Sequence, residues 1–344
     1  MWTAERQTIP ERSQPYAAGM LLHAIRYFPK TPRRAYPANV KTEPTSTTVQ
    51  GLKKLQRIHQ SSGKHWVGNG FPVRSVFDYN GLGRELSPFL LLDYAAPHPF
   101  APGTEKRGVG AHPHKGFETV TVAYQGELEH RDSSGGGGKI GPGDVQWMTA
   151  GKGIVHEEFH SEAFVREGGT LQMVQLWVNL RAKDKAAPPG YQTLPKAQIP
   201  NVDLPEGAGT VRVIAGDFGG HPGAAKTFTP INVWDVELRA GKSTEFPLPE
   251  GHTTTILVLS GEVGWPGEGE PSERTVAREG ALAIFTRAGA GVAVAAKTEA
   301  HILVMSGEPI PEPVVGHGPF VMNTRAEIEQ AFEDYQLGRM GELI

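Results

Sequence analysis

Short apolar runs rich in β-branched residues recur along the chain from about residue 68. Gly, Pro, Asp or Asn borders most of these runs. Such runs are typical of strands, and their turn-forming borders are typical of an all-β fold. The strands that this pattern predicts lie within residues 120–127, 143–151, 171–180, 211–218, 231–238, 253–262, 281–287 and 301–308.

The strand pattern repeats once along the chain. Gly126 follows one strand and Gly143 precedes the next, while Gly261 and Gly280 occupy the same places in the second half. A strand–turn–strand unit that occurs twice predicts two duplicated β-barrels.

A Pro-rich polar connector over residues 182–192 is the best boundary between the halves. We therefore place an N-terminal barrel at residues 61–185 and a C-terminal barrel at residues 186–322. Residues 1–60 have little periodicity and many Pro, Thr and Arg residues, so we expect a disordered extension. A weak signal peptide, an Arg-rich targeting segment, or an upstream extension with Met20 as the true start are the alternatives.

One clear helix pattern closes the chain, over about residues 323–344. Thr324 and Glu327 have the spacing of a capping box, in which each side chain bonds the backbone of the other residue. The apolar residues that follow at helical spacing are Ile328, Phe332 and Tyr335. We expect this helix to pack on a barrel.

Composition excludes several classes of protein. The 344 residues are 38% hydrophobic, carry a formal net charge of −3 and include no cysteine. A net charge of this size does not indicate binding to nucleic acid. No apolar run approaches the roughly 18 residues that span a bilayer. Without thiolates, any metal must bind His, Asp or Glu. We expect a cytoplasmic monomer.

Two short motifs have the spacing of metal ligands on strands. His112 and His114 flank Pro113, and residues two apart on a strand point to the same face. Proline restricts such a segment to a strand start or edge, as at the mouth of a barrel. His156 and Glu158 form a second pair with the same spacing. Three imidazoles and one carboxylate suit a divalent first-row metal.

The segment 156–160 also matches H-E-x-x-H, the motif of zinc proteases. The longer form of that motif fails at Ala163, and no capping residue stands next to the start of the helix it needs. A protease helix would also leave His112 and His114 without a role. We therefore favour a strand, on which Glu157 would face outward.

Four longer segments resemble a known family. They read GVGAHPHKGFETVTVAYQGELEHRDSSG from residue 108, GPGDVQWMTAGKGIVHEE from residue 141, GHGPFVMNT from residue 316 and VRSVFDYNGLGRELSPFLLLDYAAP from residue 73. These segments closely resemble the pirin family of bicupins. The resemblance spans about residues 55–340 and leaves out only the N-terminal extension.

The resemblance implies a fold and a metal site. It implies an all-β fold of two stacked cupin (jelly-roll) β-barrels, with one metal in the N-terminal barrel. Matched residue by residue, the ligands fall on His112, His114, His156 and Glu158. Iron is the usual metal of the family, so the expected cofactor is one divalent ion, Fe(II), with other first-row metals as alternatives.

The chain departs from the wider cupin pattern at one acid. Most cupins use a glutamate at the position of Glu118, whereas pirins use the position of Glu158, which we favour. In the second repeat, the positions that correspond to His114 and His156 hold Pro249 and Ala293. We therefore expect the C-terminal barrel to bind no metal.

Other residues near the motifs have less specific roles. We expect His130 and His160 at the surface or around the site rather than in a direct role. Core packing is the simplest role for Phe117, Trp147 and Met148, although an aromatic substrate pocket is an alternative.

Two functions are compatible with the resemblance. The first is a dioxygenase that opens the ring of quercetin or a similar flavonol with O₂, with Glu158 accepting the proton of the substrate hydroxyl group. The second is a non-catalytic metalloprotein that binds a protein partner in a redox-sensitive way, because a shared site does not fix a function.

Overall fold

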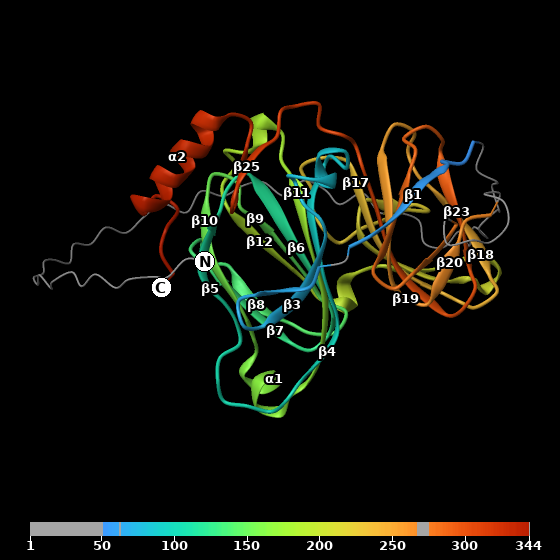
Figure 1. The fold of residues 1–344 in the computed structure, drawn as a ribbon, viewed down its shortest axis with the longest axis horizontal. Coiled ribbons are helices and arrows are strands. Elements are labelled where there is room, and N and C mark those ends of the chain that lie inside the picture. Colours follow the sequence, from blue (N-terminus) through green and yellow to red (C-terminus); the bar gives the residue numbers. More distant parts are fainter. Residues whose placement is uncertain (1–50, 62, 267–274, 344) are drawn as a thin grey trace, which may run out of the picture. The chain divides into compact units, whose positions relative to one another are not determined.

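The computed structural model describes residues 51–61, 63–266 and 275–343 (Figure 1). Within these ranges the chain is mostly β, with two α-helices and four short 3-10 turns. The all-β prediction is confirmed.

The N-terminal barrel has two sheets. The large sheet has the order β12-β9-β6-β11-β4-β3-β2 and the small sheet β5-β10-β7-β8. The strands are β2 (His65–Val67), β3 (Phe71–Phe77), β4 (Phe89–Phe100), β5 (Gly108–His114), β6 (Phe117–Gln125), β7 (Leu128–Asp132), β8 (Gly137–Ile140), β9 (Val145–Thr149), β10 (Ile154–His160), β11 (Gly169–Asn179) and β12 (Gly190–Leu194).

The C-terminal barrel repeats this arrangement. Its sheets have the orders β1-β22-β19-β24-β17-β14-β13 and β18-β23-β20-β21. The strands are β1 (Leu55–Gln60), β13 (Asn201–Asp203), β14 (Gly209–Ala215), β17 (Ile231–Leu238), β18 (Ser243–Pro247), β19 (Thr253–Ser260), β20 (Glu262–Gly264), β21 (Val276–Arg278), β22 (Ala281–Phe285), β23 (Gly291–Ala296) and β24 (Ala300–Gly307). Two small hairpins join β15 (Asp217–Phe218) to β16 (His221–Pro222), and β25 (Val315–His317) to β26 (Phe320–Met322).

The two barrels share a hydrophobic core. Val120 and Val122 of β6 contribute to one buried cluster that also contains Leu257 of β19 and Leu303 of β24. On the opposite face of β6, Ala123 belongs to a cluster inside the N-terminal barrel. Because both faces of β6 are covered, its sequence is nearly continuous in buried residues rather than alternating.

Strand pairing crosses the predicted domain boundaries in three places. β1 pairs with β22 of the C-terminal barrel, although it precedes the N-terminal barrel in sequence. β12 pairs with β9 of the N-terminal barrel, beyond residue 185. Phe320 of β26 bridges to Lys115 beside β5. The division into domains stays a prediction, and most of the extension expected at residues 1–60 lies outside the described residues.

The C-terminal helix α2 (Arg325–Gln336) begins after Thr324 and has the predicted capping box. Ile328 belongs to the same buried cluster as Phe320 of β26 and Val155 of β10, so the helix packs on the N-terminal barrel. Tyr335 differs from the prediction, because it is exposed rather than part of the apolar stripe.

A second helix, α1 (Glu162–Glu167), follows β10 and was not predicted. Among the described helices, neither α1 nor α2 is long and apolar enough to cross a membrane.

Candidate metal centre

Antiparallel pairing of β5 and β10 brings three of the predicted ligands together. His112 lies opposite His156 in this pairing, and His114 lies opposite Ile154. One ligand nitrogen from each of His112, His114 and His156 lies within 4.8 Å of the others. Side-chain alternation on both strands therefore places three imidazoles at one point, as the spacing predicted.

Backbone carbonyl groups orient two of these rings. The Nδ1 atom of His112 lies 2.8 Å from the Gly110 carbonyl oxygen, and that of His114 lies 3.4 Å from the Pro319 carbonyl oxygen. A carbonyl oxygen only accepts, so each Nδ1 carries the hydrogen and each Nε2 keeps its lone pair. The Nε2 atom of His156 is buried without a hydrogen-bond partner. Metal ligation needs such free imidazole lone pairs, so the residues fit a metal.

Burial keeps two of these imidazoles, those of His114 and His156, neutral. It lowers the pKa of His114 and of His156 well below the ordinary value, and the neighbouring His112 lowers both further. Neutral imidazole is the form that binds a metal, so a cation need not displace protons here. His112 is partly exposed, which leaves one side of the group open to solvent.

Glu158 lies in an adjacent, overlapping group. Its two carboxylate oxygens accept hydrogen bonds from the Nε2 atoms of Gln146 and Gln175. It shares a second group of possible ligand atoms with His156 and His130, again within 4.8 Å of one another. The four predicted ligands thus fall into two groups that share His156 rather than into one.

His130 is buried, so of the two places expected for it, the surface and the surroundings of the site, it occupies the second. Its Nδ1 atom lies 3.3 Å from Nδ1 of His156, and its Nε2 atom lies 3.1 Å from Oδ2 of Asp132. Its ring stacks on Tyr191 with a centroid distance of 4.6 Å. His130 and Asp132 lie two residues apart on β7, so their side chains share a face. This is the same spacing that indicated His112 and His114 as ligands.

Asp132 has an unusually acidic carboxyl group. Burial alone would raise its pKa, but hydrogen bonds from His130, Ser134 and Gly136 outweigh burial and lower the pKa to about 2. The side chain is therefore a carboxylate, which only accepts hydrogen bonds.

His160 is also buried, so of the two places expected for it the surface is excluded. Its Nε2 atom donates to the Gly70 carbonyl oxygen at 2.8 Å, and its ring packs edge-on against Phe71 and Phe100. It belongs to neither group of possible metal ligands in the described part of the chain.

Glu118 lies outside both groups as well. Thr149 Oγ1 donates to its carboxyl group at 2.8 Å, and burial raises its pKa to about 7. Phe117, Trp147 and Met148 are fully buried, as core packing requires.

The described part of the C-terminal barrel contains no group of possible metal ligands. Its His301 is engaged instead with Asp235, at 2.6 Å.

Comparisons with known proteins agree with this geometry. The sequence profile described as Pirin matches residues 70–178, and the profile described as Pirin C-terminal cupin domain matches residues 233–341. A protein of Pseudomonas aeruginosa named "putative quercetin 2,3-dioxygenase" is 55% identical over 288 residues, which cover 84% of this chain and 98% of that protein. The chain belongs to the pirin family.

Two further relatives support this assignment. Human pirin is 37% identical over 296 residues, which cover 85% of this chain and 95% of that protein. A crystal structure of quercetin 2,3-dioxygenase from Acinetobacter baumannii is 49% identical, with a TM-score of 0.81, and covers 85% of this chain and 100% of that one. The two-barrel cupin fold that the resemblance implied is confirmed.

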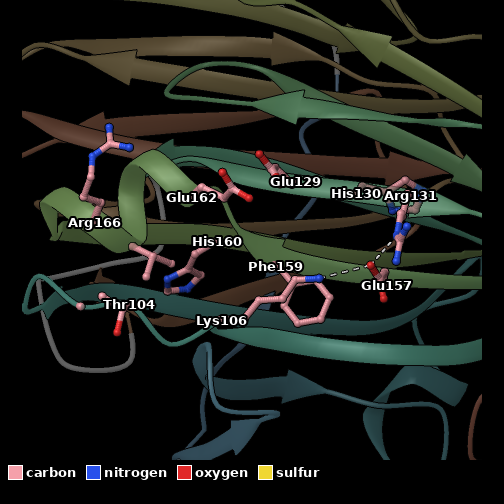
Figure 2. Close-up of a pocket in the computed structure, with 12 residues that line it drawn as sticks. Thr104, Lys106, Glu129, His130, Arg131, Glu157, Phe159, His160, Glu162 and Arg166 are labelled. Carbon is pink, nitrogen blue, oxygen red and sulfur yellow. Dashed lines mark hydrogen bonds and ion pairs between the residues drawn. The ribbon is translucent and has the colours of Figure 1, made fainter.

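This pirin also has a cavity of about 680 Å³ lined in part by residues of β10 (Figure 2). Glu157 lines it and accepts hydrogen bonds from Arg131 Nε at 2.5 Å and Lys106 Nζ at 3.4 Å. Phe159 lines it too, but of the possible metal ligands only His130 does. Glu157 therefore faces away from the three-histidine group, on a different face of the strand.

Proposed function

We propose that this pirin is a metal-dependent dioxygenase that opens the ring of quercetin or a similar flavonol with O₂. The observation that carries this proposal is the group of three histidines with free Nε2 atoms, partly open to solvent at His112. The 55% identity to a relative named for this activity supports the choice of reaction.

His112, His114 and His156 would hold the metal, with Glu158 as the fourth ligand. This donor set accepts first-row divalent metals in general, and we propose iron(II), the usual metal of the family. The bound metal would make the deprotonated flavonol hydroxyl group available at neutral pH and provide open positions for binding.

The protein's own residues prepare the site for this chemistry. The carboxylate of Glu158 accepts the proton of the flavonol hydroxyl group, and Gln146 and Gln175 hold that carboxylate in place. Phe117 and Trp177 stack on each other at 4.2 Å, and both rings pack against His114. These two rings hold His114 and exclude water from one side of the site.

We also propose that the N-terminal barrel carries the chemistry and that the C-terminal barrel is structural. Both groups of possible ligands in the described residues lie on β5, β7 and β10. The shared core explains why the second barrel is needed, since it covers one face of the large sheet.

The test is quercetin loss and O₂ uptake by the iron-loaded protein. His114→Ala should lose both metal and turnover, because it removes a ligand from the group. The matched control is His221→Ala, which changes an exposed histidine of the C-terminal barrel and should keep both. Protein that retains iron but shows no quercetin loss and no O₂ uptake contradicts the proposal.

A further inference from the structure

Three polar side chains form a chain of hydrogen bonds that ends at a proposed metal ligand. Asp132 Oδ1 accepts from the backbone N–H groups of Ser134 and Gly136 and from the Ser134 hydroxyl group. Asp132 Oδ2 faces Nε2 of His130 at 3.1 Å. Nδ1 of His130 faces Nδ1 of His156 at 3.3 Å. The side chains of Asp132, His130 and His156 are all buried.

The hydrogen positions along this series of hydrogen bonds follow from the carboxylate of Asp132, at which the series begins. A carboxylate only accepts, so Nε2 of His130 carries a hydrogen and donates it to Asp132. In its neutral form His130 has one N–H group, so its Nδ1 is then left as an acceptor. The hydrogen of His156 must then lie on its Nδ1, and its Nε2 keeps the lone pair. That Nε2 is the atom that is buried without a partner.

We propose that Asp132 and His130 are positioning residues that select the metal-binding tautomer of His156. The other two histidines need no such device, because their Nδ1 atoms face carbonyl oxygens of Gly110 and Pro319, which accept only. His156 faces another imidazole, which can donate or accept. The direction of that hydrogen bond is therefore set one residue further away, by Asp132. The inference rests on the metal site of the proposed function and not on its substrate.

Asp132→Asn tests the donor–acceptor direction of the hydrogen bonds from Asp132 through His130 to His156. The three donors on Oδ1 select the amide oxygen for that side, so the amide NH₂ group faces His130. His130 must then accept at Nε2 and donate from Nδ1, which moves the hydrogen of His156 onto Nε2 and blocks ligation. We expect the affinity of the full-length chain for Co²⁺ to fall about 10–100-fold, with a changed visible spectrum of the remaining complex.

Ser134→Ala is the matched control. It removes one hydrogen bond from Oδ1 of Asp132 and leaves the contact with His130 in place. We expect its Co²⁺ affinity to change by less than about twofold. Circular dichroism checks that each variant is folded before its affinity is measured.

His130→Phe and the double variant separate the tautomer from other effects. Phenylalanine keeps a ring that can stack on Tyr191 but offers no nitrogen to His156. Neither tautomer is then imposed, so H130F should lose less affinity than D132N. Once His130 is gone, adding D132N should have no further effect.

Several results would overturn the inference. A larger loss in H130F than in D132N would make His130 a ligand itself. If D132N lowered the Co²⁺ affinity as much in the H130F background as in the wild type, Asp132 would act through the turn at residues 133–136 and not through His130. Wild-type protein that binds no Co²⁺ would overturn the proposed metal site as well, whereas equal binding by wild type and D132N would overturn the tautomer inference alone.

Discussion

At the scale of single residues, two adjacent glutamates of β10 face different surroundings. Glu158 is buried beside His156 and bonded by two amides, whereas Glu157 pairs with the largely exposed side chains of Arg131 and Lys106. In metal-saturated protein, Glu158→Gln removes the proposed proton acceptor and should lower kcat by about 10²–10⁴-fold. Glu157→Gln is the matched control and should change kcat by less than about twofold, since its ion pairs face solvent. Steady-state rates of quercetin loss check this, and equal losses in both variants would exclude the role of Glu158.

Glu118 gives a prediction about stability and pH. Burial raises its pKa from the ordinary 4.5 to about 7, so the folded protein holds this proton to a higher pH than the unfolded chain. The free energy of unfolding therefore falls as the pH rises from about 4.5 to 7, by a contribution on the order of 3 kcal/mol. Glu118→Gln removes the titration and should remove this loss, so the variant should be the more stable protein at pH 8.

Urea unfolding of metal-free protein between pH 5 and pH 8 measures this difference. Glu329→Gln changes an exposed glutamate of α2 and serves as the control, whose curve should follow that of the wild type. A wild type and an E118Q variant with parallel pH profiles would show that Glu118 does not titrate in this range.

The sequence predicted the three-histidine group because alternation along a strand determines which side chains share a face. His112, His114 and His156 needed only that rule and the pairing of β5 with β10. The same rule applied to His130, but its role depends on Asp132 and on a turn at residues 133–136, which no local pattern connects to His156.

At the scale of elements, the segments that strand patterns could not place are those that pair over long distances in sequence. β1 adds to β22, more than two hundred residues later, and is too short and polar to indicate its partner. β25 and β26 follow the second barrel in sequence, yet Phe320 of β26 bridges to Lys115 of the N-terminal barrel. These placements follow from packing and backbone pairing, on which a single segment carries little information.

Lys185 connects several of these elements. Its buried Nζ donates to the carbonyl oxygens of Gly116 and Val321 and to Oδ1 of Asn179, at 2.7, 3.0 and 2.7 Å. Gly116 follows the His114 strand, and Val321 belongs to β26, close to the carbonyl group that orients His114. Lys185→Met keeps most of the side-chain volume but leaves three buried acceptors unpaired.

We expect Lys185→Met to lower the free energy of unfolding by about 3 kcal/mol and to weaken metal binding, because the turn after β5 is no longer tied to β26. Urea unfolding and Co²⁺ titration measure the two effects. Lys183→Met, two residues away and exposed, should change neither. A lower free energy of unfolding without any change in metal affinity would show that the hydrogen bonds of Lys185 do not position His114.

At the scale of the whole molecule, the barrels are joined by the shared core and by a buried hydrogen bond. Tyr94 of β4 donates to the carbonyl oxygen of Leu259 on β19 at 3.0 Å, within that core. β1 and the C-terminal segment also connect the barrels in opposite directions along the chain. β1 completes the large sheet of the C-terminal barrel from before the N-terminal barrel, and Phe320 bridges back to Lys115 from beyond the second barrel, so we expect the two to unfold together.

Ile302→Ala, in the C-terminal barrel, tests whether that barrel unfolds together with the barrel that holds the proposed metal site. Ile302 is fully buried in the core of the C-terminal barrel, and its truncation should cost about 2–5 kcal/mol. If the barrels unfold as one unit, the urea midpoint for metal release from the N-terminal barrel falls together with the midpoint from far-UV circular dichroism. The reciprocal variant Ile140→Ala, in the interior of the N-terminal barrel, should lower the same two midpoints. Two separate transitions, with metal release unchanged by Ile302→Ala, would instead mean that the shared core does not couple the barrels and that the metal site depends on the N-terminal barrel alone.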